Sequence, residues 1–212
     1  MSEQLDAWAQ LFSNPKSFFI KDRETNDMGL FITAMIIFCL GYGIDRVDRQ
    51  LVKFDVRGTL DDFEFLNSWP GYWLVSIVGG AIGGYIAYLI GGWFYNVRVK
   101  WSKGKGDLKY SRRIYLFANF YVYLANVVVS LCATLILPLP YDPYAEFSAF
   151  DGASAVILLF MIFYSLYISF SGVMATTGAD KTRATIWFIV LPAFFYIAAF
   201  GALILLLWNA WV

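Results

Sequence analysis

The chain has 212 residues, of which 59% are hydrophobic, 20% are aromatic and only 15% are charged, and its formal net charge is zero. Because soluble domains usually carry about 25% charged residues, the deficit indicates that lipid rather than water surrounds most of the chain. The absence of histidine excludes a histidine general base, a serine–histidine or cysteine–histidine relay and the commonest metal ligand.

Other residue types that are common in catalytic and metal-binding sites are also scarce. Cys39 and Cys132 lie in apolar runs and form no C-x-x-C pair, so neither a zinc site nor a redox motif is predicted. A net charge of zero gives no basic field that would attract nucleic acid. We therefore expect a non-enzymatic protein with no cofactor, no metal and no nucleic-acid partner.

Residues 1–27 are predicted to form a cytoplasmic arm that contains an amphipathic helix. One face of a helix over residues 5–12 would be apolar, since it carries Leu5, Trp8, Ala9 and Phe12. This pattern is typical of a helix that lies in the membrane interface. A capping residue followed by proline, Asn14-Pro15, then begins a second helical turn.

Residues 28–212 are predicted to form a transmembrane domain. Five apolar runs are long enough, or nearly so, to cross a ~30 Å hydrocarbon core at 1.5 Å per residue. They lie at residues 28–44, 72–95, 114–137, 153–173 and 184–208. The predicted fold is therefore all-α: a polytopic membrane protein with a five-helix bundle and an N-terminal interfacial amphipathic helix. Pro192 should kink the fifth run.

The distribution of lysine and arginine predicts the orientation of the bundle. Residues 1–27, 96–113 and 174–183 fall on one side of the membrane and together hold twelve of these residues, against four in residues 45–70 on the other side. Because positive charge collects on the cytoplasmic side, the N-terminus should be cytoplasmic and the C-terminus outside.

The second run carries small residues at every fourth position. They are Gly79, Gly83, Ala87 and Gly91, and beside them a shorter edge consists of Gly80 and Gly84. This spacing lets a neighbouring helix backbone approach closely in a bilayer. We expect one of the two faces to pack within the monomer. The second and third runs should form the centre of the bundle, which a homo-oligomer could share.

The third run carries a polar face. Its members are Tyr115, Asn119, Asn126, Ser130 and Thr134, which recur at helical spacing. The first interpretation is hydrogen bonding between neighbouring helices, at about 0.6 kcal/mol per bond. The second is a polar lining for a ligand or a hydrated path. The first interpretation is favoured.

The loop between the second and third runs is strongly basic. It holds Arg98, Lys100, Lys103, Lys105, Lys109, Arg112 and Arg113, with one acid, Asp107. These residues fix the topology, and contact with anionic lipid head groups would contribute about 1 kcal/mol per basic residue near the surface. Docking of an acidic cytoplasmic protein is a further option.

The order of these features resembles the Yip (Ypt-interacting protein) family of five-span membrane proteins, in its bacterial form. The arm ends in Phe12-Ser-Asn-Pro-Lys-Ser-Phe-Phe19, the second run is glycine-rich, and the basic loop enters the third run through Arg112-Arg113. The resemblance implies a cytoplasmic N-terminus, a five-helix fold, helix-mediated oligomerisation and, for the bacterial form, a place in the bacterial inner membrane. Eukaryotic relatives act in vesicle traffic through Rab-type GTPases. This sequence lacks their long N-terminal region and acidic D-L-Y-G-P-type segment, so a Rab-linked function is not expected.

Two functional hypotheses follow from the sequence. The leading one is a non-enzymatic membrane scaffold or adaptor that organises partner proteins or lipids. The alternative is a small permease or channel, perhaps built from several copies, with its polar path along the third run. A third idea, an enzyme acting on lipid, would have to depend on Asp45, Asp48 and Arg49 at the outer interface.

Overall fold

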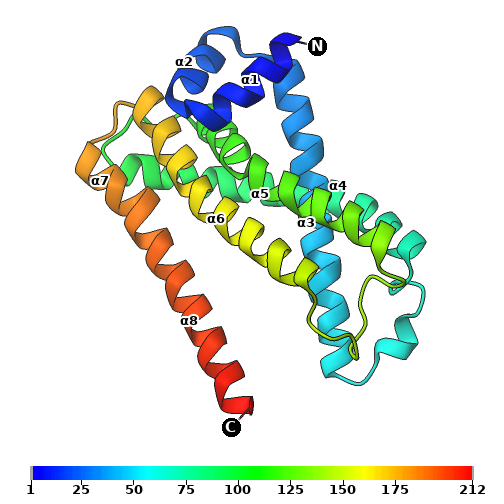
Figure 1. Ribbon diagram of the computed structural model, residues 1–212. Coiled ribbons are helices and arrows are strands. Elements are labelled where there is room, and N and C mark those ends of the chain that lie inside the picture. Colours follow the sequence, from blue (N-terminus) through cyan, green and yellow to red (C-terminus); the bar gives the residue numbers. More distant parts are fainter. Residues whose placement is uncertain (1, 212) are drawn as a thin grey trace.

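The computed structural model describes residues 2–211, and the side chains of residues 4–202. Every regular element in that range is helical (Figure 1). In chain order they are α1 (Ser2–Ser13), α2 (Pro15–Thr25), α3 (Met28–Val56), the 3-10 turn η1 (Leu60–Phe63), α4 (Trp69–Trp101), α5 (Leu108–Ile136), α6 (Ala149–Thr176), α7 (Lys181–Thr185), the π-helical turn η2 (Ile186–Val190) and α8 (Leu191–Trp211). The prediction of an all-α fold is confirmed.

Five helical segments are long and apolar enough to cross a membrane. They are α3, α4, α5, α6 and the continuous stretch Lys181–Ala202 that joins α7, η2 and the first part of α8. In Figure 1, α1 and α2 lie together at one end of this bundle. The architecture is that of a polytopic helical membrane protein.

The first long helix is longer than its apolar run, because α3 continues past Ile44 to Val56. The charged residues that follow the run support this extension. Arg49 pairs with Asp45 one helical turn away, at 2.9 Å between Nη2 and Oδ1, as the i,i+4 spacing predicts. The opposite face of the same turns is buried through Val47 and Leu51.

Helix α3 crosses α4 and α5 instead of running parallel to them (Figure 1), and glycines make the crossing close. A Cβ atom on Gly43 of α3 would lie 1.9 Å from the carbonyl oxygen of Ser76. A Cβ atom on Gly80 of α4 would lie 2.3 Å from the carbonyl oxygen of Cys39, and one on Gly84 would lie 2.8 Å from the Cα of Cys39. The Gly80–Gly84 edge is therefore the one that packs within the chain, backbone against backbone.

The longer small-residue face is open at one end and packed at the other. A Cβ atom on Gly79 would have nothing within 4 Å, and one on Gly83 would touch the ring of Tyr42 in α3, at 3.0 Å. Ala87 is half-buried against the main core, and a Cβ atom on Gly91 would lie 2.4 Å from the Tyr115 ring of α5. This face therefore meets side chains, whereas the Gly80–Gly84 edge meets the backbone of α3.

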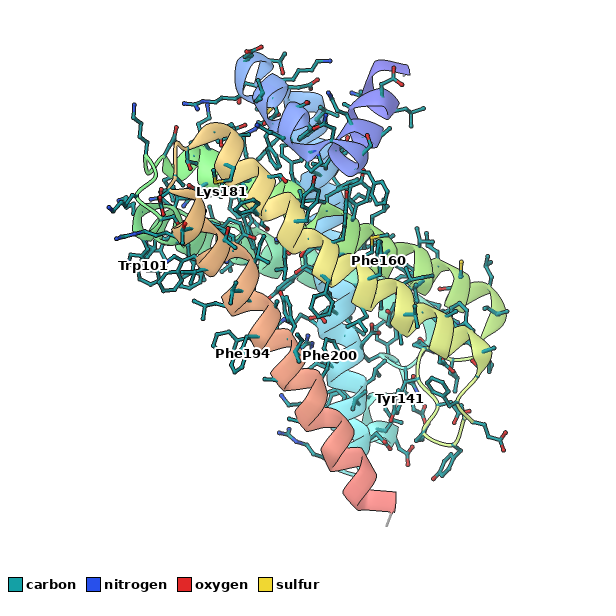
Figure 2. The ribbon with its side chains drawn as sticks, turned by 60° about the vertical axis from the view of Figure 1, so that its left-hand side comes forward. Trp101, Tyr141, Phe160, Lys181, Phe194 and Phe200 are labelled. Atoms are coloured by element: carbon teal, nitrogen blue, oxygen red, sulfur yellow. The ribbon has the colours of Figure 1, made fainter. Side chains whose placement is uncertain are left out.

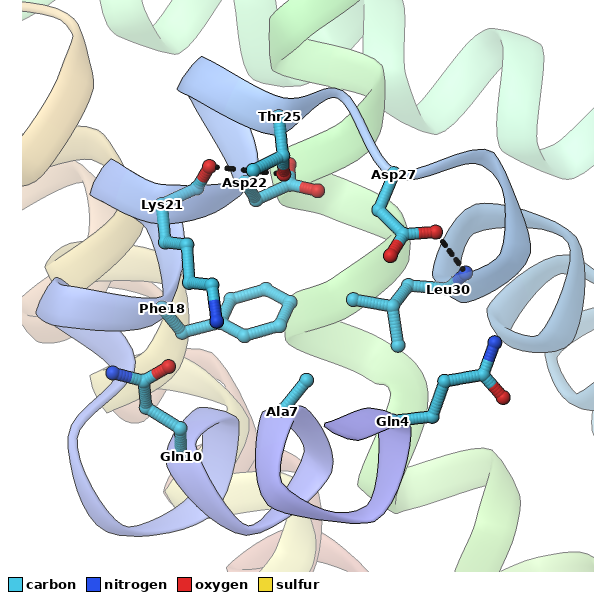
Figure 3. A pocket seen from close by; sticks show the side chains of 9 residues that line it. All are labelled: Gln4, Ala7, Gln10, Phe18, Lys21, Asp22, Thr25, Asp27 and Leu30. Atoms are coloured by element: carbon cyan, nitrogen blue, oxygen red, sulfur yellow. Dashed lines mark hydrogen bonds between the residues drawn. The ribbon is translucent and has the colours of Figure 1, made fainter. Parts of the chain in front are cut away.

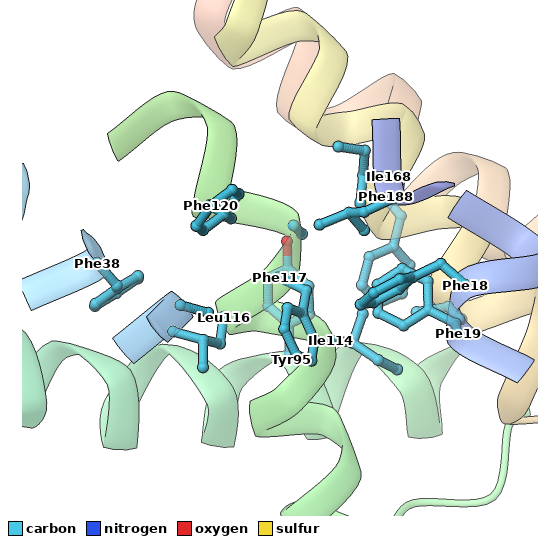
Figure 4. Packing of buried hydrophobic residues seen from close by; sticks show 14 of the residues in the cluster. Phe18, Phe19, Phe38, Tyr95, Ile114, Leu116, Phe117, Phe120, Ile168 and Phe188 are labelled. Atoms are coloured by element: carbon cyan, nitrogen blue, oxygen red, sulfur yellow. The ribbon is translucent and has the colours of Figure 1, made fainter. Parts of the chain in front are cut away.

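The main core joins the arm to the bundle (Figure 4). Phe18 and Phe19 of α2 are buried and meet the ring of Phe117 of α5, with Phe18 at 5.0 Å between ring centroids. On the other side, a Cβ atom on Gly172 of α6 would come within 2.8 Å of the Phe19 ring. A glycine in α6 therefore makes room for an aromatic side chain of the arm.

Helix α1 has two apolar sides. Ala7 and Leu11 are buried against the rest of the protein, and Trp8 is half-buried against Phe120 of α5. Leu5, Ala9 and Phe12 of the predicted apolar face are exposed, so the helix in an interface stays a prediction for that side.

Pro192 perturbs the fifth span through hydrogen bonding. Residues 186–190 form a π-helical turn, in which the N–H of Leu191 donates to the carbonyl of Ile186, five residues back. The next bond in this register would run from residue 192 to the carbonyl of Trp187, but proline has no N–H to donate. The guanidinium of Arg98 from α4 donates to that carbonyl instead. A buried arginine thus supplies the donor that proline lacks.

The close crossing of α3 and α4 predicts that substitutions at two adjacent glycines have different effects on stability. Replacing Gly80 by leucine should lower the free energy of unfolding by about 3 kcal/mol or prevent folding, because the side chain would overlap a backbone that cannot retreat. Gly79→Leu is the matched control, since its Cβ position is open. Unfolding in mixed micelles measures both variants. Equal stability of the two would contradict this packing.

Candidate functional site: the docked arm and the basic face

A buried ion pair fixes the arm to the bundle. The guanidinium of Arg113 in α5 binds the carboxylate of Asp22 in α2 through two hydrogen bonds, from Nε to Oδ2 at 3.0 Å and from Nη2 to Oδ1 at 2.5 Å. The side chains of Arg113 and Asp22 are only 5% and 1% exposed. The same Nη2 also donates to the carbonyl of Asp27 at 3.1 Å. One guanidinium therefore holds both α2 and the turn that leads into α3.

The residues around this pair explain why the chain turns here. Asn14 caps α2 by accepting a hydrogen bond from the Ser17 N–H at 3.2 Å, and Pro15 occupies the first helical turn, where its missing N–H costs nothing. Asn26 ends α2 in the left-handed conformation, with φ of 48°. Asp27 then caps α3 by accepting bonds from two backbone N–H groups. The Asn14-Pro15 element is thus the start of the helix that carries Phe18 and Phe19.

Two tyrosines of α5 bind the backbone of the arm. The hydroxyl of Tyr110 donates to the carbonyl of Phe19 at 2.8 Å, and the hydroxyl of Tyr121 donates to the carbonyl of Trp8. The Trp8 ring also stacks on Phe120, with 4.2 Å between centroids. Both helices of the arm are therefore anchored by hydrogen bonds as well as by aromatic packing.

Sequence reasoning overlooked Asp22. Its partner lies in another helix, 91 residues away, and no local pattern pairs the two positions. One signal was present: Asp22 follows Phe18 by four residues and Phe19 by three, so it shares their face of α2. A charged residue on the face that carries two phenylalanines needs a buried partner.

A polar cavity lies between the arm and the start of α3 (Figure 3). Its volume is about 460 Å³, and its lining residues come from α1, α2 and α3 and the turn before α3. Lys21 and Asp27 contribute charged groups to it, and Phe18 forms part of its wall. Asp22 also lines this cavity, but its carboxylate is already engaged by Arg113.

The basic segment divides into buried and exposed residues. Arg98 and Arg113 are buried, at 9% and 4% exposure, and Arg112 is half-buried, with its side chain against Gly92 of α4. The expectation that all seven residues face lipid or a partner is therefore wrong for Arg98 and Arg113. Both lie inside helices, where they bind a carbonyl and a carboxylate respectively.

The loops beside the exposed lysines are joined to each other by backbone hydrogen bonds. The N–H of Lys105 donates to the carbonyl of Thr177, and the N–H of Asp180 donates to the carbonyl of Ser102, both at 2.8 Å. These bonds join the loop after α4 to the loop after α6. The exposed basic residues in these loops and in the helix ends beside them are Lys100, Lys103, Lys105, Lys109, Lys181 and Arg183. We call this set the basic face.

Aromatic residues lie beside the basic face. Trp101 is 46% exposed, and its ring packs against Trp187 at 4.5 Å between centroids. Figure 2 places Trp101 and Lys181 at the same end of the bundle, far from Tyr141. Exposed tryptophan next to lysine is typical of a membrane–water interface.

The polar face of α5 is used partly between helices. The side-chain amide of Asn126 donates to the carbonyl of Gly41 in α3 at 3.2 Å. The indole N–H of Trp73 in α4 donates to the hydroxyl of Thr134 at 3.1 Å. These contacts join α5 to both of its crossing neighbours.

The other members of the polar face have separate surroundings. The hydroxyl of Ser130 lies 3.3 Å from that of Tyr72 in α4. Asn119 donates to the carbonyl of Tyr115 within α5, at 2.8 Å, and the Tyr115 ring fills the space beside Gly91. The five residues therefore do not form one continuous polar lining.

The fold and these surfaces define an integral membrane protein of the polytopic helical class. A family model described as the Yip1 domain matches residues 9–204, which is nearly the whole chain, so the chain belongs to the Yip1 domain family. No curated protein and no solved structure matches it.

The ion pair makes a stability prediction. Asp22→Leu should cost about 3–5 kcal/mol of unfolding free energy, because it leaves a buried arginine without its counter-charge. Adding Arg113→Met should recover part of this loss, since the double variant buries no charge. The double-mutant cycle is measured by unfolding in mixed micelles.

The exposed pair Asp45–Arg49 provides the matched control for that cycle. Asp45→Asn should change the unfolding free energy by about 0.5 kcal/mol or less, as is usual for a surface pair one helical turn apart. If Asp22→Leu is equally mild, Arg113 does not depend on Asp22 and the proposed role of the pair is wrong.

Proposed function

We propose that this protein is a non-enzymatic scaffold of the bacterial inner membrane that gathers anionic lipids at its cytoplasmic end. The observation that carries the proposal is the basic face. Its exposed basic residues lie in and beside two loops that backbone hydrogen bonds join, so their charges are held together near one end of the bundle. Each lysine near an anionic surface contributes about 1 kcal/mol of attraction.

The proposed orientation has the N-terminus in the cytoplasm and the C-terminus outside. It is supported by the way three separate segments meet. The arm binds the start of α5 through Asp22 and Arg113, while the loops after α4 and α6 bind each other. Together the three segments hold twelve of the sixteen lysine and arginine residues, as expected of the cytoplasmic side.

The alternative, a permease or channel along α5, is not favoured. Asn126 and Thr134 bind neighbouring helices and Asn119 binds its own helix. These polar groups are therefore already occupied at the places where a hydrated path would need them free.

The test compares anionic-lipid retention in two variants with matched charge changes. The first replaces the exposed lysines by glutamine at Lys100, Lys103, Lys105 and Lys109. The protein is reconstituted in nanodiscs of phosphatidylcholine and phosphatidylglycerol in equal amounts, and native mass spectrometry counts the lipids that stay bound. We expect phosphatidylglycerol to be enriched on the wild type and to fall to its bulk fraction on this variant.

The control makes the same change at the opposite end, at Arg46, Arg49, Lys53 and Arg57. Acidic residues of the same region, Asp45, Asp48, Asp55 and Asp61 among them, offset these charges, so enrichment should persist. Equal enrichment on the wild type and the lysine variant would show that the basic face does not select anionic lipid.

A further inference from the structure

A second cleft lies at the end of the bundle opposite the basic face. It has a volume of about 370 Å³, within the size range of ligand pockets. Its walls come from the last turns of α3 and α5, the first turns of α4 and α6, and the connector between α5 and α6. Tyr141, which lines it, marks this end of the molecule in Figure 2.

A carboxylate stands in the wall of this cleft. Asp48 is half-buried, and its Oδ1 accepts a hydrogen bond from the Tyr72 hydroxyl at 2.9 Å. The Ser130 hydroxyl lies 3.3 Å from that of Tyr72 and extends the chain of hydrogen bonds. Asp48 is therefore held in place from α4 and α5, although it belongs to α3.

The charge of Asp48 lacks a counter-charge. Among the residues that the structure describes, Tyr72 is the one hydrogen-bond donor to this carboxylate, and no lysine or arginine nitrogen lies within 4 Å of it. None of the described residues that line the cleft is basic. The other acid in the wall, Asp151, is engaged in the capping box of α6 with Ser148. A half-buried carboxylate without a partner favours a cationic ligand.

Aromatic side chains surround the same space. They are Trp69, Tyr72, Tyr141 and Phe150. The faces of aromatic rings attract ammonium and guanidinium groups, and the attraction is stronger when the cation is removed from water. Carboxylate and aromatic walls together are a suitable environment for an ammonium group.

The connector that closes one side of the cleft is held firmly. Asn67 and Tyr141 exchange two hydrogen bonds, at 2.9 and 3.0 Å, and the indole N–H of Trp69 donates to the carbonyl of Leu137 at 2.9 Å. The hydroxyl of Tyr141 donates to Asp55 at 2.8 Å. Burial and this bond raise the pKa of Tyr141 to about 12, so the hydroxyl remains a donor at neutral pH.

We propose that this cleft binds an ammonium group, with Asp48 as its counter-charge and the aromatic residues as its walls. Two sources carry this chemistry: the ethanolamine head group of a lipid and a free amine in solution. Anionic head groups are excluded by Asp48, so the cleft and the basic face select opposite charges.

The first experiment uses the full chain in maltoside micelles, which contain no ammonium group. One arm adds phosphatidylethanolamine or phosphatidylglycerol and counts bound lipid by native mass spectrometry. The other arm titrates free ethanolamine and follows tryptophan fluorescence, because Trp69 lines the cleft. Retention of phosphatidylethanolamine identifies the lipid source, whether or not phosphatidylglycerol is also held at the basic face, and a response to free ethanolamine identifies the soluble source.

The variants locate the binding. Asp48→Asn keeps an acceptor for Tyr72 but removes the charge, and should weaken binding of the responding probe about tenfold or more. Asp45→Asn removes an exposed charge one turn away and should change the affinity by less than about twofold. Ser154→Phe fills the cleft from α6 without altering Asp48, and should also abolish binding.

Three results would overturn the proposal. One is the absence of binding in both arms with the wild type. Another is unchanged affinity in Asp48→Asn or, if that variant does not fold, in Ser154→Phe. The third is a loss of phosphatidylglycerol in Asp48→Asn equal to the loss of phosphatidylethanolamine, because a site built around a carboxylate cannot treat the two head groups alike.

Discussion

The buried pair of Asp22 and Arg113 is the interaction on which the arrangement of this chain depends. Neither charge can be taken out of water alone, so the arm and the start of α5 must be buried together. Because Arg113 also holds the Asp27 carbonyl, the pair sets the place where α3 begins. From there α3 crosses α4, and the glycines at the crossing let the backbones meet.

The two ends of the bundle differ in charge and in the kinds of side chain that gather there. At one end, backbone bonds between loops gather lysines on the surface, while the buried arginines of that region are used to hold helices and the arm together. At the other end, aromatic residues and carboxylates meet around a cleft. This division of charge between the two ends is the basis of the proposed scaffold function.

Much of the fold followed from composition and hydropathy. The five long helices coincide with apolar runs, and Asn14-Pro15 begins a helix as its capping chemistry predicts. Charge patterns were less informative, because an arginine near the end of a run looks the same in sequence whether it faces water or a buried partner. Arg98 and Arg113 both appeared to belong to a solvated loop, yet each is buried against a specific oxygen.

The sequence alone could not show which face of a helix is covered by its neighbours. Gly79 and Gly80 are neighbours with the same composition around them, and only the crossing direction of α3 decides that Gly80 is covered and Gly79 open. The covered face of α1 likewise depends on where α2 and α5 stand. Asp48 lay in a segment assigned to a loop, so its meeting with Tyr72 and Ser130 required three helices to be placed first.

The most direct test of this account is amide hydrogen exchange of the arm in nanodiscs. If the arm is part of the bundle, the amides of α2 around Phe18 and Asp22 should exchange as slowly as those at the start of α5, because opening one requires breaking its contact with the other. If they exchange at the rate of a solvated peptide while α5 stays protected, the arm is not docked and the central role of the Asp22–Arg113 pair is wrong.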